Sequence, residues 1–296
     1  MKGRLPSWFR QKPPDPEVMS SMVRLLDNLS LHTICESALC PNIGQCFAQR
    51  TATFLILGDV CTRHCTFCAV KKGQPLPVDD EEPQHLLKAV EMLNLYYVVI
   101  TSVSRDDLSD GGASHFVRAI NILHERRNGT LVEVLIPDFL GSTEALRTVV
   151  EARPEVINHN VETVPRLYSE VRPEADYDRS LRLLSMVKSL SQKIVTKSGL
   201  MLGLGETRAE VIEVMKDLRK VNCDLLTIGQ YLQPSHKHHP VLRFVSPEEF
   251  SEYERIGKGM GFSGIASAPL VRSSFKAAEL YAKACKSSAK IAQSEE

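Results

Sequence analysis

Short apolar segments and amphipathic helical segments alternate along most of this 296-residue chain, and no other feature of the sequence limits its fold as strongly. Strand-length apolar runs recur six times, and the segments between them carry apolar residues at helical spacing. Such alternation produces parallel strands joined by right-handed crossovers. Because six units fall short of a closed eight-unit barrel, the pattern predicts an α/β fold, an open, partial (β/α)6 TIM-like barrel. The predicted strands are Thr53–Leu57, Tyr96–Thr101, Leu131–Ile136, Glu155–His159, Ile194–Leu202 and Leu225–Gln230, with a weaker seventh at Phe262–Ala266.

The predicted helices begin at residues that are typical of helix N-termini. Asp15 precedes a proline and is expected to cap the first helix. Thr207 with Glu210, and Ser246 with Glu249, have the spacing of a capping box. No linker divides the chain into separately folding halves. Helices are predicted over Gln84–Leu93, Ser114–Arg126, Thr143–Glu151, Ser180–Leu190 and Thr207–Val221, with a final helix from about Phe275.

Charge and hydropathy exclude two classes of partner. Lys+Arg and Asp+Glu both number 36, so the net charge is zero, whereas a protein that binds nucleic acid through phosphates needs a basic excess. The longest apolar runs, such as Tyr96–Ile100, are far shorter than the roughly 20 residues of a membrane span. The N-terminus lacks the apolar core of a secretory signal and carries four prolines. We therefore expect a cytoplasmic protein, whose thiols stay reduced.

The sharpest chemical motif is the run Cys61-Thr-Arg-His-Cys65-Thr-Phe-Cys68, directly after the first predicted barrel strand. Three thiolates on one loop can hold three irons of a cubane iron–sulfur cluster, which leaves the fourth iron open to a small molecule. A structural zinc site normally requires a fourth protein ligand. His64 has the right chemistry but would have to fold back between two ligands. A cluster is the favoured interpretation, with zinc or inert thiols as the alternatives.

A second cysteine motif, Cys35-x4-Cys40-x5-Cys46, precedes the first. Clustered cysteines in a long chain with reduced thiols indicate metal ligands more often than disulfides. Pro41 and Gly44 favour a loop over a helix for this segment. We predict a second cluster whose fourth ligand comes from elsewhere in the chain; three buried, inert thiols are the alternative.

Both motifs, together with several longer blocks, resemble a known family. The C-x3-C-x2-C run resembles the signature of the radical S-adenosylmethionine superfamily, and the chain as a whole is similar to the lipoyl synthase family from about Leu5 to Ala278. The blocks that carry the resemblance are CPNIGQCF, SRDDLSDGGASHF, NHNVETVPRLY, TKSGLMLGLGE, TIGQYLQPSHKHHPV and PLVRSSF.

The resemblance implies two 4Fe–4S clusters with different tasks. Cys61, Cys65 and Cys68 would hold the radical-forming cluster, whose open iron binds the amine and carboxylate of S-adenosylmethionine. Cys35, Cys40 and Cys46, with Ser274 of the Arg-Ser-Ser-Phe motif, would hold an auxiliary cluster that supplies sulfur. Without the resemblance, Ser273 and Ser274 read as an N-cap of the last helix. The implied organisation is an N-terminal extension (1–50) with the auxiliary cysteines, the barrel (51–266), and a C-terminal segment (267–296) with the serine ligand.

Further residues are candidate contacts of S-adenosylmethionine. The resemblance places Phe67 near the adenine. The other candidates lie just after predicted strands, or near a strand end in the case of Lys197, where parallel α/β folds place their sites, with ordinary turn, cap or surface roles as the alternatives. They are Ser104, Arg105, Asn160, Glu162, Lys197, which could meet a carboxylate, and Gly203, whose lack of a side chain permits close approach. The loop histidines His236, His238 and His239 are not favoured as a metal site.

Three positions depart from the family pattern. Ser104 stands where the family usually has Asp, Ala268 where it has Gly, and Phe275 where it has Tyr. All six cluster cysteines are present. These departures bear on substrate preference or rate and leave the predicted reaction class unchanged.

The implied activity is insertion of two sulfur atoms at C6 and C8 of a protein-bound octanoyl-lysine. Such C–H bonds have no acidity that a side-chain base can use, which is why a radical is required. The implied partners are octanoylated glycine-cleavage H protein and 2-oxoacid dehydrogenase lipoyl domains, with a flavodoxin or ferredoxin as electron donor. The alternatives are another radical sulfur-inserting enzyme with a different acceptor and a non-catalytic two-cluster redox or iron sensor.

Overall fold

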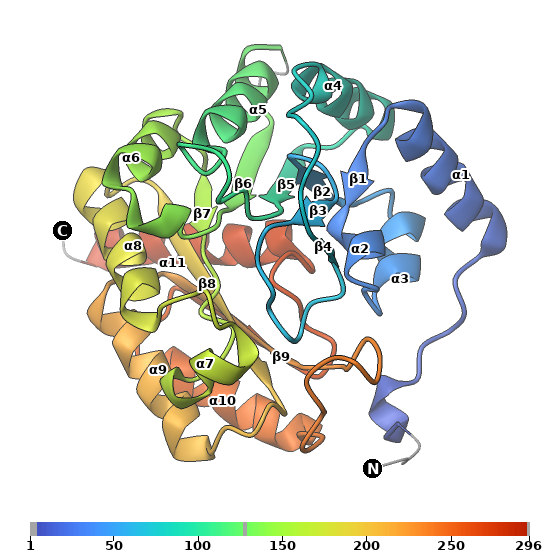
Figure 1. Ribbon diagram of the computed structural model, residues 1–296. Coiled ribbons are helices and arrows are strands. Elements are labelled where there is room, and N and C mark those ends of the chain that lie inside the picture. Colours follow the sequence, from blue (N-terminus) through green and yellow to red (C-terminus); the bar gives the residue numbers. More distant parts are fainter. Residues whose placement is uncertain (1–4, 127–128, 295–296) are drawn as a thin grey trace.

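A computed structural model describes residues 5–126 and 129–294 of the chain, and its main feature is an eight-stranded sheet wrapped by helices (Figure 1). The strand order is β1-β2-β5-β6-β7-β8-β9-β10. Among the strands of this sheet in the described residues, the β1–β2 pair is antiparallel and every other pair is parallel. The strands are β1 His32–Thr33, β2 Thr53–Ile56, β5 Tyr97–Ser102, β6 Leu131–Leu135, β7 Val156–Asn158, β8 Val195–Leu202, β9 Leu225–Gln230 and β10 Gly264–Ser267, and a separate parallel pair comprises β3 Val60–Cys61 and β4 Lys71–Lys72.

The helices connect consecutive strands and form an arc around the outside of the sheet (Figure 1). The crossover helices are α4 Glu82–Leu93, α5 Ala113–Arg126, α6 Thr143–Glu151, α8 Tyr177–Leu190, α9 Arg208–Lys220 and α10 Pro247–Gly259. The remaining helices are α1 Pro16–Asn28, α2 Ile34–Ser37, α3 Ile43–Ala48, α7 Tyr168–Val171 and α11 Ala277–Ser294, with short 3-10 turns η1 Ser7–Phe9, η2 Phe139–Gly141 and η3 Pro165–Leu167.

The α/β prediction and all six strands are confirmed, and the weak seventh strand is real. β10 pairs in parallel with β9, with Gly264 opposite Leu225, so the sheet has seven parallel strands rather than six. Gly264 lies against Leu225 and Leu280 with no room for a Cβ, and this small residue at its start weakens the apolar pattern of the strand. Among the described strands, β1 and β10 form the two open edges of the sheet.

The loop predicted for Cys35–Cys46 is wrong in part, because the segment contains most of two short helices, α2 and α3. The side chain of Thr33 caps α2 by accepting a hydrogen bond from the backbone N–H of Glu36 at 3.3 Å. Helices of one or two turns are too short to show helical periodicity. Of the two residues that indicated a loop, Pro41 lies in the break between the helices, whereas Gly44 lies within α3.

Helix caps follow the predictions with one difference. Asp15 accepts from the backbone N–H groups at the start of α1, and Thr207 with Glu210 forms a complete capping box on α9. Ser246 caps α10 by accepting from the N–H of Glu249. The Glu249 carboxylate, however, binds Arg243 at 2.8 and 2.9 Å, so this second box is only half formed.

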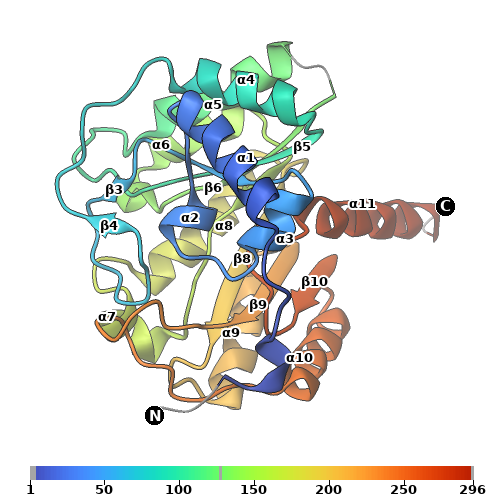
Figure 2. The ribbon, with the colours of Figure 1, turned by 90° about the vertical axis from the view of Figure 1, so that its right-hand side faces the viewer.

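The last helix and the cysteine-bearing loop lie at opposite ends of the strands. α11 packs on the amino ends, where Leu280 contacts Leu225 of β9 and the Tyr281 ring lies 5.8 Å from that of Tyr97. Figure 2 shows α11 projecting on one side and the β3–β4 loop on the other. None of the described helices is both long and apolar enough to cross a membrane. The amino ends of the strands are therefore closed, and the opposite ends carry the loops.

Candidate active site

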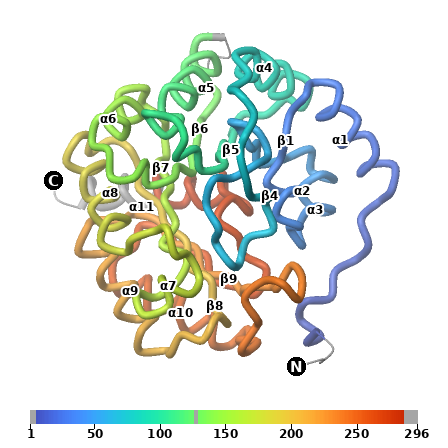
Figure 3. The backbone as a smooth tube through the Cα atoms, viewed as in Figure 1, coloured from blue at the N-terminus to red at the C-terminus, as the bar shows by residue number. Residues whose placement is uncertain are grey.

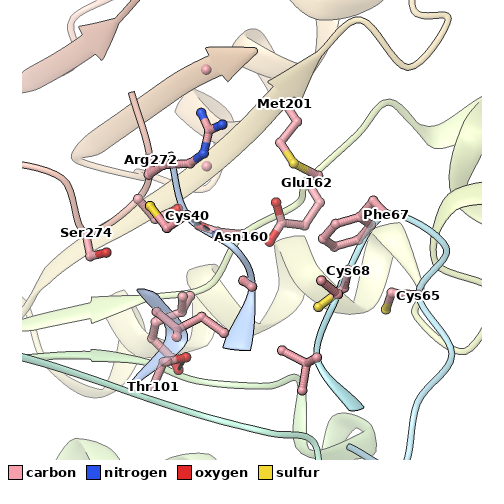
Figure 4. Close-up of a pocket in the computed structure, with 18 of the residues that line it drawn as sticks. Cys40, Cys65, Phe67, Cys68, Thr101, Asn160, Glu162, Met201, Arg272 and Ser274 are labelled. Atoms are coloured by element: carbon pink, nitrogen blue, oxygen red, sulfur yellow. Dashed lines mark hydrogen bonds between the residues drawn. The ribbon is translucent and has the colours of Figure 1, made fainter. Parts of the chain in front are cut away.

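A cavity of about 500 Å³ opens at the carboxyl ends of the parallel strands. It is lined by the ends of β5, β6, β8 and β9, by the cysteine loop, and by the C-terminal segment. Figure 4 shows Cys40, Arg272 and Ser274 on one side of the cavity and Cys65, Phe67 and Cys68 on the other, with Asn160 and Glu162 between them. Of the predicted cluster ligands, Cys46 is not among the lining residues, and those that line the cavity are Cys35, Cys40, Cys61, Cys65, Cys68 and Ser274.

The loop that carries Cys61, Cys65 and Cys68 is closed at its base by the β3–β4 ladder, in which Cys61 pairs with Lys72. The Lys72 ammonium also donates to the Cys65 carbonyl at 2.9 Å. The backbone N–H of Ser104 points at the Cys61 sulfur, 3.3 Å away. These contacts hold the Cys61 thiol against the end of β5 and limit the movement of Cys65.

Arg63, between the first two cysteines of the loop, anchors the loop to the protein interior. Its guanidinium is only 4% exposed; it binds Asp106 at 2.7 and 2.9 Å and Asp138 at 2.6 Å. Arg179 of α8 binds the other oxygen of Asp138 at 3.0 Å. Two carboxylates therefore balance two guanidinium groups behind the loop, and sequence alone did not indicate this network.

The Asp138 carboxylate gives the network a dependence on pH. Burial alone would raise its pKa, but the hydrogen bond and positive charge of Arg63 outweigh burial and lower the pKa to about 2. A folded-state pKa below the unfolded value means that the carboxylate stabilises the fold above about pH 4 and loses this effect as pH falls toward 2. We expect the stability difference between the cluster-free wild type and Asp138→Asn to shrink below pH 4, as measured by urea unfolding at pH 7, 5 and 3. A difference independent of pH would contradict this assignment.

All eight cysteines of the chain are free thiols. Burial raises the pKa of Cys65 and Cys46 to about 11, and that of Cys35 and Cys68 to about 12. Thiols in such surroundings are protonated at neutral pH and become thiolates only when a metal replaces the proton. Two groups of three soft sulfur donors fit iron–sulfur clusters well.

The N-terminal segment and the segment around Leu270 both contact the Cys35–Cys46 segment. The buried Asn42 amide donates to the Leu270 carbonyl at 2.7 Å, across 228 residues of sequence, and Gln11 donates to the Asn42 side-chain oxygen. Pro14 lies so close to Gly44 that a Cβ there would come within 2.5 Å of it. Further along, the Phe9 and Phe244 rings pack 5.7 Å apart, where the N-terminal segment meets the loop before α10 (Figure 3).

The two serines of the Arg-Ser-Ser-Phe motif have different environments, and both precede α11, which begins at Ala277. Ser273 exchanges hydrogen bonds with the Asn160 side chain at 2.7 and 3.0 Å. Ser274 lines the cavity on the same side as Cys40 (Figure 4). Cys40 and Ser274, 234 positions apart in the sequence, thus reach one cavity.

Of the seven predicted S-adenosylmethionine contacts, Phe67, Ser104, Asn160 and Glu162 line the cavity. Arg105 does not, because its 2% exposed side chain binds Asp107 and the Leu57 carbonyl. Gly203 does not line it either. It has φ +100°, and its free face is filled by the side-chain amide of Gln230.

Lys197 also lies outside the lining, and its expected carboxylate partner belongs to the protein. Its ammonium binds Glu133 at 2.7 Å, and both side chains are fully buried among the barrel strands. Tyr97 and Asn158 donate to the same carboxylate. Lys197 is the third residue of β8, five positions before its carboxyl end, so its side chain lies below the cavity within the barrel.

Lys197→Met is expected to lower the free energy of unfolding by about 3–5 kcal/mol, because it leaves the Glu133 charge buried without its cation. Binding of S-adenosylmethionine to the folded fraction should be unchanged by calorimetry. The double variant Lys197→Met/Glu133→Gln is the matched control and should regain much of the lost stability. Weaker ligand binding at full stability would instead place Lys197 at the ligand.

Sequence reasoning missed three polar or flexible residues of the cavity. Arg172 is 8% exposed and donates to the Asn160 and Val161 carbonyls, and it lines the cavity together with Met201 and Arg272. Arg272 belongs to the serine motif and Met201 to the glycine-rich end of β8, so both had a sequence signal. Arg172 had none.

The loop histidines serve the backbone of the cysteine loop. His238 contacts the Cys68 carbonyl through Nε2 at 3.2 Å, and the backbone N–H of His239 donates to the Thr66 carbonyl at 2.9 Å. In the described part of the chain, no three His, Cys, Asp or Glu side chains converge as they would on a single metal ion. A cubane cluster bonds each thiolate to a different iron and does not require that convergence.

Comparisons with known proteins agree with this geometry. Residues 55–218 match the family described as the radical SAM superfamily. A lipoyl synthase of Caldanaerobacter subterraneus is 59% identical over 277 residues, which cover 94% of this chain and 97% of that protein. A lipoyl synthase of Aquifex aeolicus is 57% identical over 86% of this chain and 93% of its own length. Similarity of this extent over nearly the whole length establishes family membership.

Solved structures support the fold. HydG, a maturase of the [FeFe]-hydrogenase, superposes with a TM-score of 0.57 at 15% identity, over 84% of this chain and 62% of HydG. Methylornithine synthase superposes with a TM-score of 0.55 at 17% identity, over 84% of this chain and 77% of its own. These structures are similar to the chain in architecture, a mostly parallel α/β partial barrel.

Proposed function

The chain belongs to the lipoyl synthase family of the radical S-adenosylmethionine superfamily, and we propose that the cavity at the carboxyl ends of its strands is the site where sulfur is inserted. The activity of the family is insertion of two sulfur atoms at C6 and C8 of a protein-bound octanoyl-lysine. Its cofactors are two 4Fe–4S clusters and S-adenosylmethionine. The observation that carries the proposal is that five of the six motif cysteines and Ser274 line one cavity.

Within the cavity, we assign Cys61, Cys65 and Cys68 to the radical-forming cluster. Cys35, Cys40, Cys46 and Ser274 are assigned to the auxiliary cluster. A serine oxygen is a harder ligand than thiolate and binds iron less well, so it suits a cluster that gives up its sulfur. Phe67, Ser104, Asn160 and Glu162 are the proposed contacts of S-adenosylmethionine.

Once bound, the clusters and S-adenosylmethionine supply a carbon-centred radical and the sulfur to be inserted. The protein's task is to hold these groups close together and to keep water away. The cavity wall is suited to an octanoyl chain because much of it is aliphatic. The apolar lining residues include Leu55, Val70, Val103, Leu135, Ile136, Leu200 and Met201.

The proposed substrates are octanoylated carrier domains, namely the glycine-cleavage H protein and the lipoyl domains of 2-oxoacid dehydrogenases. A flavodoxin or ferredoxin is the proposed electron donor. We place the protein in the cytoplasm, because six cluster ligands must remain reduced thiols before loading. The lipoyl synthase identity of full-length relatives favours this function over the sensor and over a different acceptor.

The test is an anaerobic assay of reconstituted protein with reductant, S-adenosylmethionine and a peptide that carries octanoyl-lysine. Mass spectrometry should show two sulfur atoms added to the peptide, together with release of 5′-deoxyadenosine. A peptide carrying decanoyl-lysine is the matched control for chain length. Release of 5′-deoxyadenosine without sulfur on the peptide would overturn the proposed acceptor, and no S-adenosylmethionine cleavage would overturn the proposed chemistry.

A further inference from the structure

Asn160 connects the two sides of the cavity through its amide. The Asn160 nitrogen donates to the Ser273 hydroxyl at 2.7 Å, and that hydroxyl donates back to the Asn160 oxygen at 3.0 Å. The same nitrogen donates to the Glu162 carboxylate at 3.0 Å. Because Glu162 holds the amide from the other side, the orientation of Asn160 does not depend on Ser273 alone.

Two glycines make room for this arrangement. A Cβ on Gly199 of β8 would lie 2.6 Å from the Asn160 oxygen and 2.7 Å from the Ser273 hydroxyl. A Cβ on Gly229 of the neighbouring strand β9 would collide with the carbonyl oxygen of Val271. The segment from Val271 to Ser273 therefore lies directly on the backbone of two adjacent strands, at positions where any side chain would displace it.

The Asn160–Ser273 pair holds in place the residue that directly precedes Ser274. Both serines line the cavity; the Ser273 hydroxyl is bonded to Asn160, and the Ser274 side chain lies on the side of Cys40 (Figure 4). Asn42, in the break between α2 and α3, binds the Leu270 carbonyl and fixes the same segment from its other end. A one-residue shift of the segment would bring Ser273 to the position of Ser274.

We propose that Asn160 is a positioning residue, which sets the register of the C-terminal segment through Ser273 and thereby presents Ser274 to the auxiliary site. This inference rests on the proposed role of Ser274 as a ligand. Asn160 lies on the loop after β7, 114 positions before that ligand. Its part in the auxiliary site is additional to its predicted contact with S-adenosylmethionine.

The test uses the full chain with Cys61, Cys65 and Cys68 replaced by alanine, so that only the auxiliary cluster is loaded. Asn160→Ala, Ser273→Ala and Ser274→Ala are each introduced. The readouts are the electron paramagnetic resonance spectrum of the reduced cluster and the rate of iron release to a chelator. We expect both Asn160→Ala and Ser273→Ala to give the altered spectrum of Ser274→Ala. Iron release should be about tenfold faster than from the protein with all three residues intact, because the loss of one or two hydrogen bonds changes a rate by about that factor.

Two further variants distinguish a specific effect on the position of Ser274 from a general loss of stability. Asn160→Ala/Ser273→Ala should release iron no faster than either single variant, because both changes remove the same interaction. Ser267→Ala is the matched control; it removes a buried bond of 2.8 Å to the Phe250 carbonyl, seven residues before Ser274. It should leave the spectrum unchanged at a similar loss of melting temperature.

The outcomes distinguish the positioning role of Asn160 from the ligand role of Ser274. If Ser274→Ala alters the spectrum but Asn160→Ala and Ser273→Ala do not, the positioning role is overturned and the serine ligand stands. If Ser274→Ala leaves the spectrum unchanged, the serine ligand fails and the positioning role with it. Should Asn160→Ala not fold, Ser273→Ala, which removes a single oxygen atom, decides the question alone.

Discussion

Cys65→Ala abolishes both release of 5′-deoxyadenosine and transfer of sulfur to an octanoyl peptide, on the arrangement described here. Cys65 lies between Cys61 and Cys68 on one loop and lines the cavity beside Phe67. Without it, two thiolates remain where three irons need ligands. The measurements are the iron content, expected to fall by half, and single-turnover yields of both products, expected at background.

The matched control is Cys285→Ala, which removes an exposed cysteine of α11, at the far end of the strands from the cavity. It should retain full iron content and both activities. Release of 5′-deoxyadenosine by Cys65→Ala above background would mean that the two cysteine motifs have been assigned to the wrong clusters.

Cys40→Ala is expected to abolish sulfur insertion and to leave S-adenosylmethionine cleavage intact. The variant should still release 5′-deoxyadenosine, since the loop from Cys61 to Cys68 is untouched, but it should add no sulfur to the peptide. The reason is that Cys40 lies on the same side of the cavity as Ser274 (Figure 4), and an auxiliary cluster held there by only two thiolates is poorly retained. The octanoyl peptide should be recovered without added sulfur.

Ser37→Ala, at the end of α2, provides the comparison for Cys40→Ala, because it alters the same segment without removing a thiol. It should behave as the wild type. Full double sulfur insertion by Cys40→Ala would remove the auxiliary-cluster assignment, whereas loss of both products would show that the variant fails to fold.

Much of the fold was predictable because its signals are local. The run Leu225–Gln230 forms a fully buried strand, as its own residues indicate. Thr207 and Glu210 cap a helix through contacts within four residues of sequence. The short helices α2 and α3 were missed because one or two turns carry no periodicity. The half-formed box at Ser246 was missed because Arg243, outside the motif, competes for the Glu249 carboxylate.

The site was predictable where the residue type itself carries the chemistry. The cysteine spacings indicated clusters directly, and the resemblance to the family singled out Ser274. Lys197 was misplaced because a polar residue near a predicted strand end is compatible with a ligand or with a buried partner such as Glu133. Arg63 and Arg172 have roles that depend on distant carboxylates and carbonyls. Such pairings are set by the tertiary structure and leave no mark in a single sequence.

The hydrogen bond from Asn42 to the Leu270 carbonyl has a consequence for the order in which the molecule is built. Closing a loop of that length has an entropy cost that only the finished tertiary structure offsets. During synthesis, the loop from Cys61 to Cys68 and the first strands leave the ribosome long before Leu270 and Ser274 are made. The partners of that loop, up to His238 and His239, are also made before Leu270. The radical-forming site can thus be complete before the auxiliary site, which needs Leu270 and Ser274. Iron and sulfide for the auxiliary site must therefore be delivered after translation ends, as a separate and later event.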